Sequence, residues 1–225
     1  MFISTLGPGM LGGDRSTIEI RAGNGTHVRV TTPSASRIHA RRGECSTIAE
    51  VNLRVGAEAL LEWLPLPTIL QAEARFQQSI FATLDRGAIA LIAEIWVPGR
   101  LARGECWTFD SVDARFVAER TTGRELVADR FQLRPAIDLP DRLGILHGTD
   151  VVFGSLFVLA PDQPCHELEI ALASVLPPRA GVTRLPNTAG LLVRAIGDSS
   201  DSVIGPLWDV ARRAREALFQ PRKWR

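Results

Sequence analysis

Over most of the first 135 residues, apolar and polar side chains alternate or form short apolar runs, which is typical of β-strands. Residues 17–21 and 26–32 alternate and are rich in β-branched side chains. A Gly-Asn-Gly sequence at 23–25 separates them, so they are predicted to form a β-hairpin. Residues 48–55 alternate in the same way and predict a further strand.

Two other segments, 57–64 and 88–97, are apolar on both strand faces. A polar face would be needed only if one side of the strand met water. We therefore expect both segments to lie between two layers of structure.

A loose internal repeat links these segments, because each begins at a glycine and ends at a proline: Gly23 to Pro33, Gly56 to Pro65 and Gly87 to Pro98. The prolines are 32 and 33 residues apart. Stacked coils of a β-solenoid would give this spacing. Three hairpin-linked strands of a sandwich would give it as well, because glycine and proline commonly flank strands. The repeat leaves both architectures open.

The second half of the chain begins with the clearest hairpin, formed by residues 107–120 and 125–134 around a Thr-Thr-Gly-Arg turn. Residues 139–149 indicate a loop. Residues 151–159 and 190–196 predict two further strands.

Two helices are predicted near the C-terminus. In residues 166–176, Leu168, Leu172 and Val175 fall on one helical face, and two prolines end the pattern. Residues 206–219 predict the second helix, with Pro206 at its first position. The patterns therefore predict a mainly β fold class with two α-helices near the C-terminus.

The second helix is amphipathic, with an apolar stripe of Leu207, Val210, Ala211, Ala214 and Leu218. Its arginines, Arg212, Arg213 and Arg215, are expected to face away from that stripe. Such a basic face is either solvated or a docking surface for a partner.

Composition narrows the function classes. The 225 residues are 45% hydrophobic and 23% charged, which is ordinary for a soluble globular protein. A net charge of +1 argues against nucleic acid as a partner, and no run of 18 apolar residues predicts a membrane helix. The three cysteines are far apart in the sequence, and the first 14 residues lack the basic region of a signal peptide. We therefore expect a cytoplasmic protein.

The sequence contains little that indicates a catalytic or cofactor-binding motif. The chain has no GxSxG, and its glycine-rich start at residues 7–14 lacks the GK[ST] of a phosphate-binding loop. None of the four histidines lies four residues from another. We expect residues 12–14 to form a tight turn before a strand, and we expect neither catalysis nor a tightly bound cofactor.

Two carboxylates lie among apolar strand residues, Glu62 and Glu94. Alternation places each on the strand face of its apolar neighbours: Leu60 and Leu64 for Glu62, Ile92 and Trp96 for Glu94. Burying an unpaired carboxylate costs several kcal/mol. Each glutamate therefore needs either an arginine partner or a polar internal path.

Five short motifs follow one another in a recognisable order: Leu-Gly-Gly-Asp at 11–14, Thr-Thr-Pro at 31–33, Glu-Trp-Leu-Pro at 62–65, Pro-Gly-Arg at 98–100 and Gly-Glu at 104–105. This order resembles the UreD family of urease accessory proteins, called UreH in some organisms. The positions that carry the resemblance are Gly12, Gly13, Thr31, Thr32, Pro33, Trp63, Leu64, Pro65, Gly99, Arg100 and Gly104.

The resemblance implies a nickel-delivery scaffold rather than an enzyme. Members of this family are mostly β, with stacked strands and two α-helices. The resemblance therefore implies a mainly β fold class, a stacked or solenoid-like β-sheet domain with two α-helices near the C-terminus. They bind UreF, and through it the GTPase UreG, and dock on apo-urease to pass nickel inward along an internal channel. No cofactor is then held tightly, and nickel is bound only in transit.

On this reading the candidate acidic channel positions are Asp14, Glu62, Glu94 and Glu105. Oxygen ligands hold Ni²⁺ more loosely than imidazole or thiolate groups do, which suits a protein that must release its metal.

The chain also departs from the family pattern. It is expected to form one UreD-like domain over residues 1–225 that lacks the family's usual N-terminal strands. Leu66-Pro67 stands where the family usually has a polar pair, and residues 36–39 replace an aromatic-basic stretch. We expect these changes to affect partner affinity.

Two alternatives stay open at this point. One is an all-β binding module unrelated to urease maturation, although three of the five tryptophans lie in apolar segments typical of a core. The other is a glycoside hydrolase that uses Glu62 and Glu94 as its acid and base.

Overall fold

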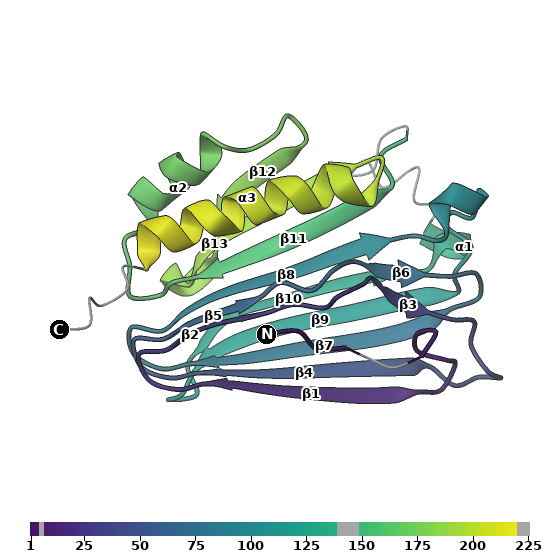
Figure 1. Cartoon of the computed structure of the whole chain (residues 1–225), viewed down its shortest axis with the longest axis horizontal. Helices are drawn as coiled ribbons and strands as arrows, with labels where there is room; N and C mark the ends of the chain where they lie inside the picture. The colour runs from purple at the N-terminus through teal and green to yellow at the C-terminus, as the bar shows by residue number, and fades with distance from the viewer. Residues whose placement is uncertain (5–6, 139–148, 220–225) are drawn as a thin grey trace.

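The computed structural model describes residues 1–4, 7–138 and 149–219, and in it two β-sheets face each other with helices on the outer side of one of them (Figure 1). The five-stranded sheet has the order β1 (Arg15–Ala22), β4 (Thr47–Val55), β7 (Arg75–Leu84), β9 (Ser111–Arg120) and β10 (Glu125–Leu133). The eight-stranded sheet runs through β12 (Ala180–Arg184), β13 (Gly190–Gly197), β11 (Val152–Leu159), β8 (Ile89–Val97), β5 (Leu60–Trp63) and β2 (His27–Val30), with β3 (Ser36–Ile38) and β6 (Thr68–Leu70) attached.

From β1 to β9 the chain alternates between the two sheets, so that each coil adds one strand to each of them. Within the five-stranded sheet β1, β4, β7 and β9 are parallel neighbours. The register aligns Arg15 with Ile48, Ile48 with Gln77, and Gln77 with Asp113. This arrangement is the predicted solenoid-like stack, and it decides between the two architectures that the repeat left open.

The hairpin predicted from residues 17–32 is wrong. β1 pairs with β4 in one sheet and β2 pairs with β5 in the other, so the Gly-Asn-Gly turn is a corner between sheets. Gly25 has a φ of +67°, a conformation that suits glycine both in a solenoid corner and in a hairpin turn. The glycine therefore does not distinguish a corner between sheets from a hairpin.

The other predicted strands are confirmed, with shifted ends. β9 and β10 form the expected antiparallel hairpin, and β11 and β13 are the two later strands. Four strands were not predicted: β3, β6, β7 and β12. Of the predicted loop at 139–149, residues 139–148 lie outside the described part of the chain.

Both predicted helices are present as α2 (Cys165–Ala173) and α3 (Ser200–Leu218), together with a short α1 (Pro135–Asp138). The predicted start of α3 at Pro206 is wrong, because the helix begins six residues earlier. Ser199 caps it by accepting a hydrogen bond from the Ser202 amide, and the Ser202 side chain reaches back to Ser199. This capping box fixes the start more strongly than the proline does.

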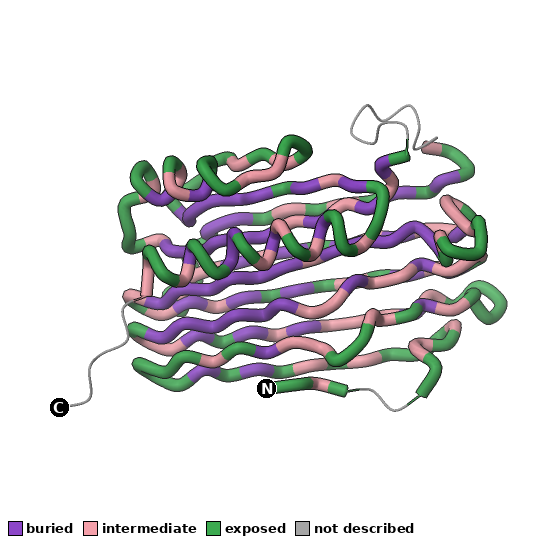
Figure 2. The backbone as a smooth tube through the Cα atoms, turned by 45° about the horizontal axis from the view of Figure 1, so that its top comes forward, coloured by how far each residue is buried: buried purple, intermediate pink, exposed green. Residues whose placement is uncertain are grey.

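The core has two main layers, one between the sheets and one between the eight-stranded sheet and the helices. β8 is buried on both faces along its length except at Glu94, as expected for a strand between two layers. Trp63 and Trp96 lie in the core at 4% exposure. In α3, the buried stripe faces the sheet and the opposite face is exposed (Figure 2). No helix in the described residues is long and apolar enough to cross a membrane.

Candidate functional site: a cavity between the sheets

Glu94 points into the space between the two sheets. On β8, Leu91, Ala93 and Ile95 pack on the helix side, so alternation turns Glu94 toward the five-stranded sheet. There the amide Nε2 of Gln78, on β7, donates a hydrogen bond of 2.6 Å to Glu94 Oε1. The predicted strand face of Glu94 is therefore confirmed, and its partner is a neutral amide rather than an arginine.

A cavity of about 160 Å³ opens beside this pair. Such a volume holds several water molecules. Besides Glu94 and Gln78, the polar and charged residues of its lining are Ser16, Thr32, Ser34, Ser36, Arg37 and Thr68. Most of the other lining residues are apolar, so the polar groups form only part of the cavity wall.

Desolvation between the sheets raises the pKa of Glu94 from 4.5 to about 7. The hydrogen bond from Gln78 and the charge of Arg194 lower this pKa, and the charge of Asp129 raises it. Near neutral pH the group is therefore shared between its acid and carboxylate forms. A cation arriving in the cavity would favour the carboxylate.

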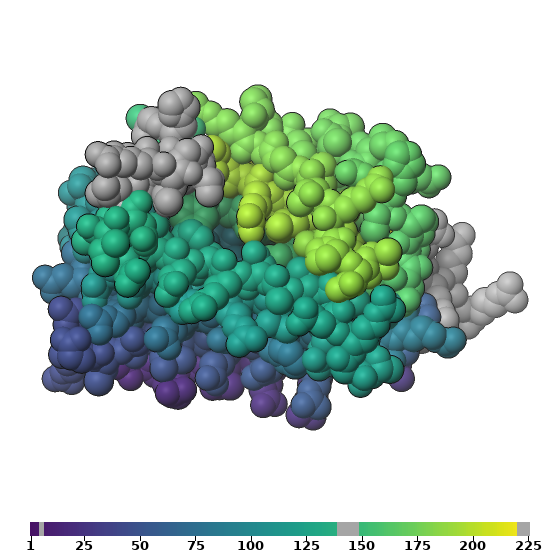
Figure 3. Space-filling model, turned by 180° about the vertical axis from the view of Figure 1, so that it is seen from behind, coloured from purple at the N-terminus to yellow at the C-terminus, as the bar shows by residue number. Residues whose placement is uncertain are grey.

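On the side away from β1, the space between the sheets is bridged by an ion pair. Arg194 of β13 donates to Asp129 of β10 at 2.7 Å. Seen from behind, a hollow separates the teal β9–β10 surface from the green-to-yellow C-terminal segment (Figure 3). In the sheet register Glu94 is opposite Ser155, which in turn is opposite Arg194, so polar side chains continue from the cavity toward this side.

Two family-like motifs form part of the cavity wall. Thr32 and Pro33 come from the Thr-Thr-Pro sequence, and Trp63 and Pro65 come from the next coil. The two motifs are stacked, because the Leu66 amide donates to Thr32 Oγ1 at 2.9 Å. Sequence segments that are about 33 residues apart therefore build one wall together.

Glu62 points to the other side of the eight-stranded sheet, toward α3. It is fully buried, and Nη1 of Arg215 lies 3.3 and 3.4 Å from its two carboxylate oxygens. His27 Nε2 is 2.6 Å from Oε1, and Arg29 Nε is 3.8 Å from Oε2. Glu62 therefore has the arginine partner that the sequence left as one alternative.

The prediction that Arg215 faces away from the buried side of α3 is wrong. Its side chain is 25% exposed and reaches back to the buried carboxylate. A long arginine stem can follow an apolar surface while its charged end finds a partner, which helical periodicity does not reveal. Arg212 and Arg213 are exposed, as expected.

Glu105 and Asp14 hold loops in place. Arg100 holds the pKa of Glu105 below its usual range by hydrogen bonding, and the Ala72 amide donates to the same carboxylate at 3.0 Å. Asp14 is exposed and accepts a hydrogen bond from the Leu11 amide at 2.8 Å, within the predicted turn. A Cβ atom at Gly12 in that turn would lie 2.3 Å from the backbone nitrogen of Arg42, so only glycine fits there.

The four acidic candidates are thus not brought together. Glu62 and Glu94 face opposite sides of one sheet, so they cannot flank one glycosidic bond. Within residues 1–4, 7–138 and 149–219, no three His, Cys, Asp or Glu side chains are placed to hold one metal ion. Of the four, only Glu94 lines the cavity. A nickel role for any of them stays a prediction.

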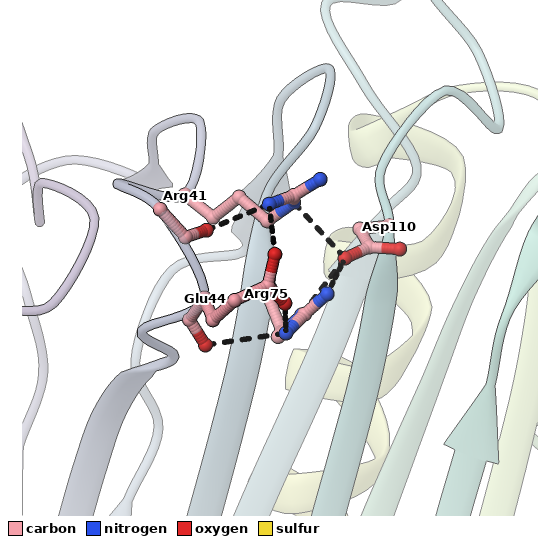
Figure 4. A network of polar contacts seen from close by, with 5 residues as sticks. Arg41, Glu44, Arg75 and Asp110 are labelled. Carbon is pink, nitrogen blue, oxygen red and sulfur yellow. Dashed lines mark hydrogen bonds and ion pairs between the residues drawn. The ribbon is translucent and has the colours of Figure 1, made fainter.

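One polar network was not predicted from the sequence (Figure 4). Asp110 accepts from Arg75 Nη2 at 2.6 Å and lies 3.3 Å from Arg41 Nε, and Glu44 pairs with Arg75 at 3.0 Å. These residues come from successive coils, and Glu44 is 84% exposed. The network fastens neighbouring coils, and no local sequence signal could have indicated it.

Known proteins resemble this sequence over most or all of its length. A family model described as UreD urease accessory protein matches residues 1–225. The urease accessory protein UreD of Haloarcula marismortui is 38% identical over 218 residues, covering 94% of this chain and 72% of that protein. UreD of Natronomonas pharaonis and UreD 2 of Brucella canis are both 34% identical, covering 91% of this chain and 70% of each relative. The chain therefore belongs to the UreD family of urease accessory proteins.

Proposed function

We propose that this protein is a cytoplasmic scaffold that binds homologues of UreF and UreG and the urease apoprotein, and helps deliver nickel to the urease active site. Membership of the UreD family assigns it a role in urease maturation. The named relatives are accessory proteins, which is consistent with a chain that acts by binding rather than by catalysis.

The observation that carries the nickel role is the cavity beside Glu94. Its lining includes the carboxyl residue Glu94, the amide residue Gln78 and several serine and threonine residues, and oxygen donors hold Ni²⁺ less tightly than imidazole or thiolate groups. Arg37 also belongs to the lining, and its positive charge would weaken the binding of a cation further. A carboxyl group with a pKa of about 7 can also exchange a proton for a cation near neutral pH. Loose, exchangeable binding is what a cargo in transit requires.

The alternative of a binding module unrelated to urease loses its support, because the family match spans the whole chain. The glycoside hydrolase alternative loses its support because its two carboxylates face opposite sides of a sheet.

The test is urease activation in a reconstituted mixture of apo-urease, nickel and the UreF and UreG homologues. Glu94→Gln removes the charge but keeps the shape and the contact with Gln78. We expect activation to fall at least several-fold, while Glu119→Gln, the same change on the outer face of β9, leaves it unchanged. Full activation by a folded Glu94→Gln protein would contradict the role of Glu94.

A further inference from the structure

Two aromatic contacts join the sheets where β9 and β10 face β11. Phe116 and Phe157 stack with their ring centroids 4.0 Å apart, and the ring centroids of Phe131 and Phe153 are 4.8 Å apart. Phe153, Ser155 and Phe157 alternate along β11, so their side chains leave the same face of the strand. The two contacts therefore hold the sheets together on either side of Ser155.

Between these contacts the facing side chains are polar. Glu94, Ser155 and Arg194 are aligned across β8, β11 and β13, and Asp129 reaches Arg194 from the other sheet. Glu94 and Ser155 are only half-buried, so a water-sized space remains beside each of them. We call Ser155, Asp129 and Arg194 the polar window, because they lie between the surroundings of Glu94 and the surface.

An ion pair crosses the polar window. Arg194 Nη2 donates to Asp129 Oδ2 at 2.7 Å, and the two side chains are 57% and 31% exposed. An ion pair with this exposure adds little stability, because water screens both charges. Breaking it therefore costs little, and the aromatic contacts keep the sheets in place when it breaks. Only the two side chains have to move.

We propose that the Asp129–Arg194 ion pair is a gate over a lateral opening of the space between the sheets. The opening is closed while the pair is formed, and it opens when the Arg194 side chain turns out into solvent. Small polar solutes and hydrated cations then pass Ser155 and reach Glu94. The opening is argued from the geometry alone, whereas its cargo, nickel, rests on the proposed function.

The test measures how fast a thiol placed in the polar window reacts. The reporter protein carries Ser155→Cys, and its native cysteines, Cys45, Cys106 and Cys165, are replaced by serine. Iodoacetamide, a small neutral reagent, modifies the folded protein, and mass spectrometry gives the rate. Arg194→Ala and Asp129→Ala should each raise this rate at least several-fold. These two variants change the local charge in opposite directions, so a rise in both reports access rather than thiol reactivity.

The matched control is Arg130→Ala. Arg130 follows Asp129 on β10, so its side chain leaves the opposite face of the strand, where it pairs with Asp113 at 2.6 Å. Loss of this outer ion pair should leave the rate unchanged. The exchanged pair Asp129→Arg/Arg194→Asp restores the ion pair of the polar window with its charges reversed, and it should bring the rate back to that of the reporter protein.

Circular dichroism confirms that each variant is folded. An unchanged rate in either single variant, an equal rise with Arg130→Ala, or no recovery in the exchanged pair would each overturn the gate. The ion pair would then only fasten the two sheets. Because the assay contains neither nickel nor urease, the gate and the proposed function can fail independently of each other.

Discussion

Glu62 and Glu94, on neighbouring strands of the same sheet, meet opposite environments because their side chains leave the sheet on opposite faces. Glu62 has cationic neighbours on the helix side, and Glu94 has an amide partner and a cavity between the sheets. Glu62 is thus paired with an arginine, whereas Glu94, with its pKa raised to about 7, can gain or lose a proton near neutral pH.

A pH dependence follows for Glu94. Its pKa rises from 4.5 to about 7 on folding, so the folded protein keeps a proton that the unfolded chain has released. Binding of this proton stabilises the folded state. The stabilisation is complete below pH 4.5 and is lost as the pH rises through about 7. Relative to Glu94→Gln, the wild type's free energy of unfolding should fall by up to about 3 kcal/mol across this window.

Urea unfolding of both proteins at several pH values measures this difference, and the exposed Glu125→Gln serves as control. If the difference between wild type and Glu94→Gln is constant from pH 4 to pH 8, the carboxyl group is not desolvated as described.

At the scale of elements, the Glu62–Arg215 pair fastens the end of α3 to β5, and the ring of His27 lies 5.3 Å from that of Phe219 just beyond the helix. Glu62→Ala leaves the arginines without their carboxylate and opens a hole in a fully buried site. We expect a loss of roughly 3 kcal/mol in the free energy of unfolding. Arg213→Ala, on the exposed face of the same helix, should cost less than about 0.5 kcal/mol.

The double variant Glu62→Gln/Arg215→Gln tests whether the two residues act as a pair. Its loss of stability should be smaller than the sum of the two single losses, because neither charge is then left without its partner. Additive losses would show that the pair does not couple α3 to β5.

The elements themselves differ in how far the sequence predicts them. Strands β4, β8 and β11 have clear apolar patterns and were found, as were both C-terminal helices. β7 was missed because Gln77, Gln78 and Ser79 interrupt its alternation, and Gln78 is the residue that meets Glu94. The hairpin predicted at 17–32 is wrong for a different reason. Its local pattern correctly predicts two strands, but their partner strands lie a whole coil away in the sequence.

The candidate site was predictable to the same degree. A carboxylate among apolar strand residues is visible in the sequence, and so is the face on which it lies. The sequence does not show which of the two glutamates pairs with an arginine, because Arg215 is 153 positions from Glu62. The cavity could not be predicted either, since its walls come from successive coils that only the stacking brings together.

For the whole molecule, the stacked coils place a cavity with several polar groups between the two sheets, and helices cover the other face of the eight-stranded sheet. In the described part of the chain, β1 and β10 are the outermost strands of the five-stranded sheet. The cavity therefore lies on the face of the eight-stranded sheet opposite to the one that the helices cover.

The central claim is that this chain delivers nickel to urease, and the most direct measurement is the nickel content of urease after maturation. Apo-urease is incubated with nickel and the UreF and UreG homologues, with and without this protein, then repurified for metal analysis. The account predicts that nickel enters the active site together with urease activity only when the chain is present, and that Glu94→Gln lowers both. Equal nickel content and activity with and without the chain would contradict it.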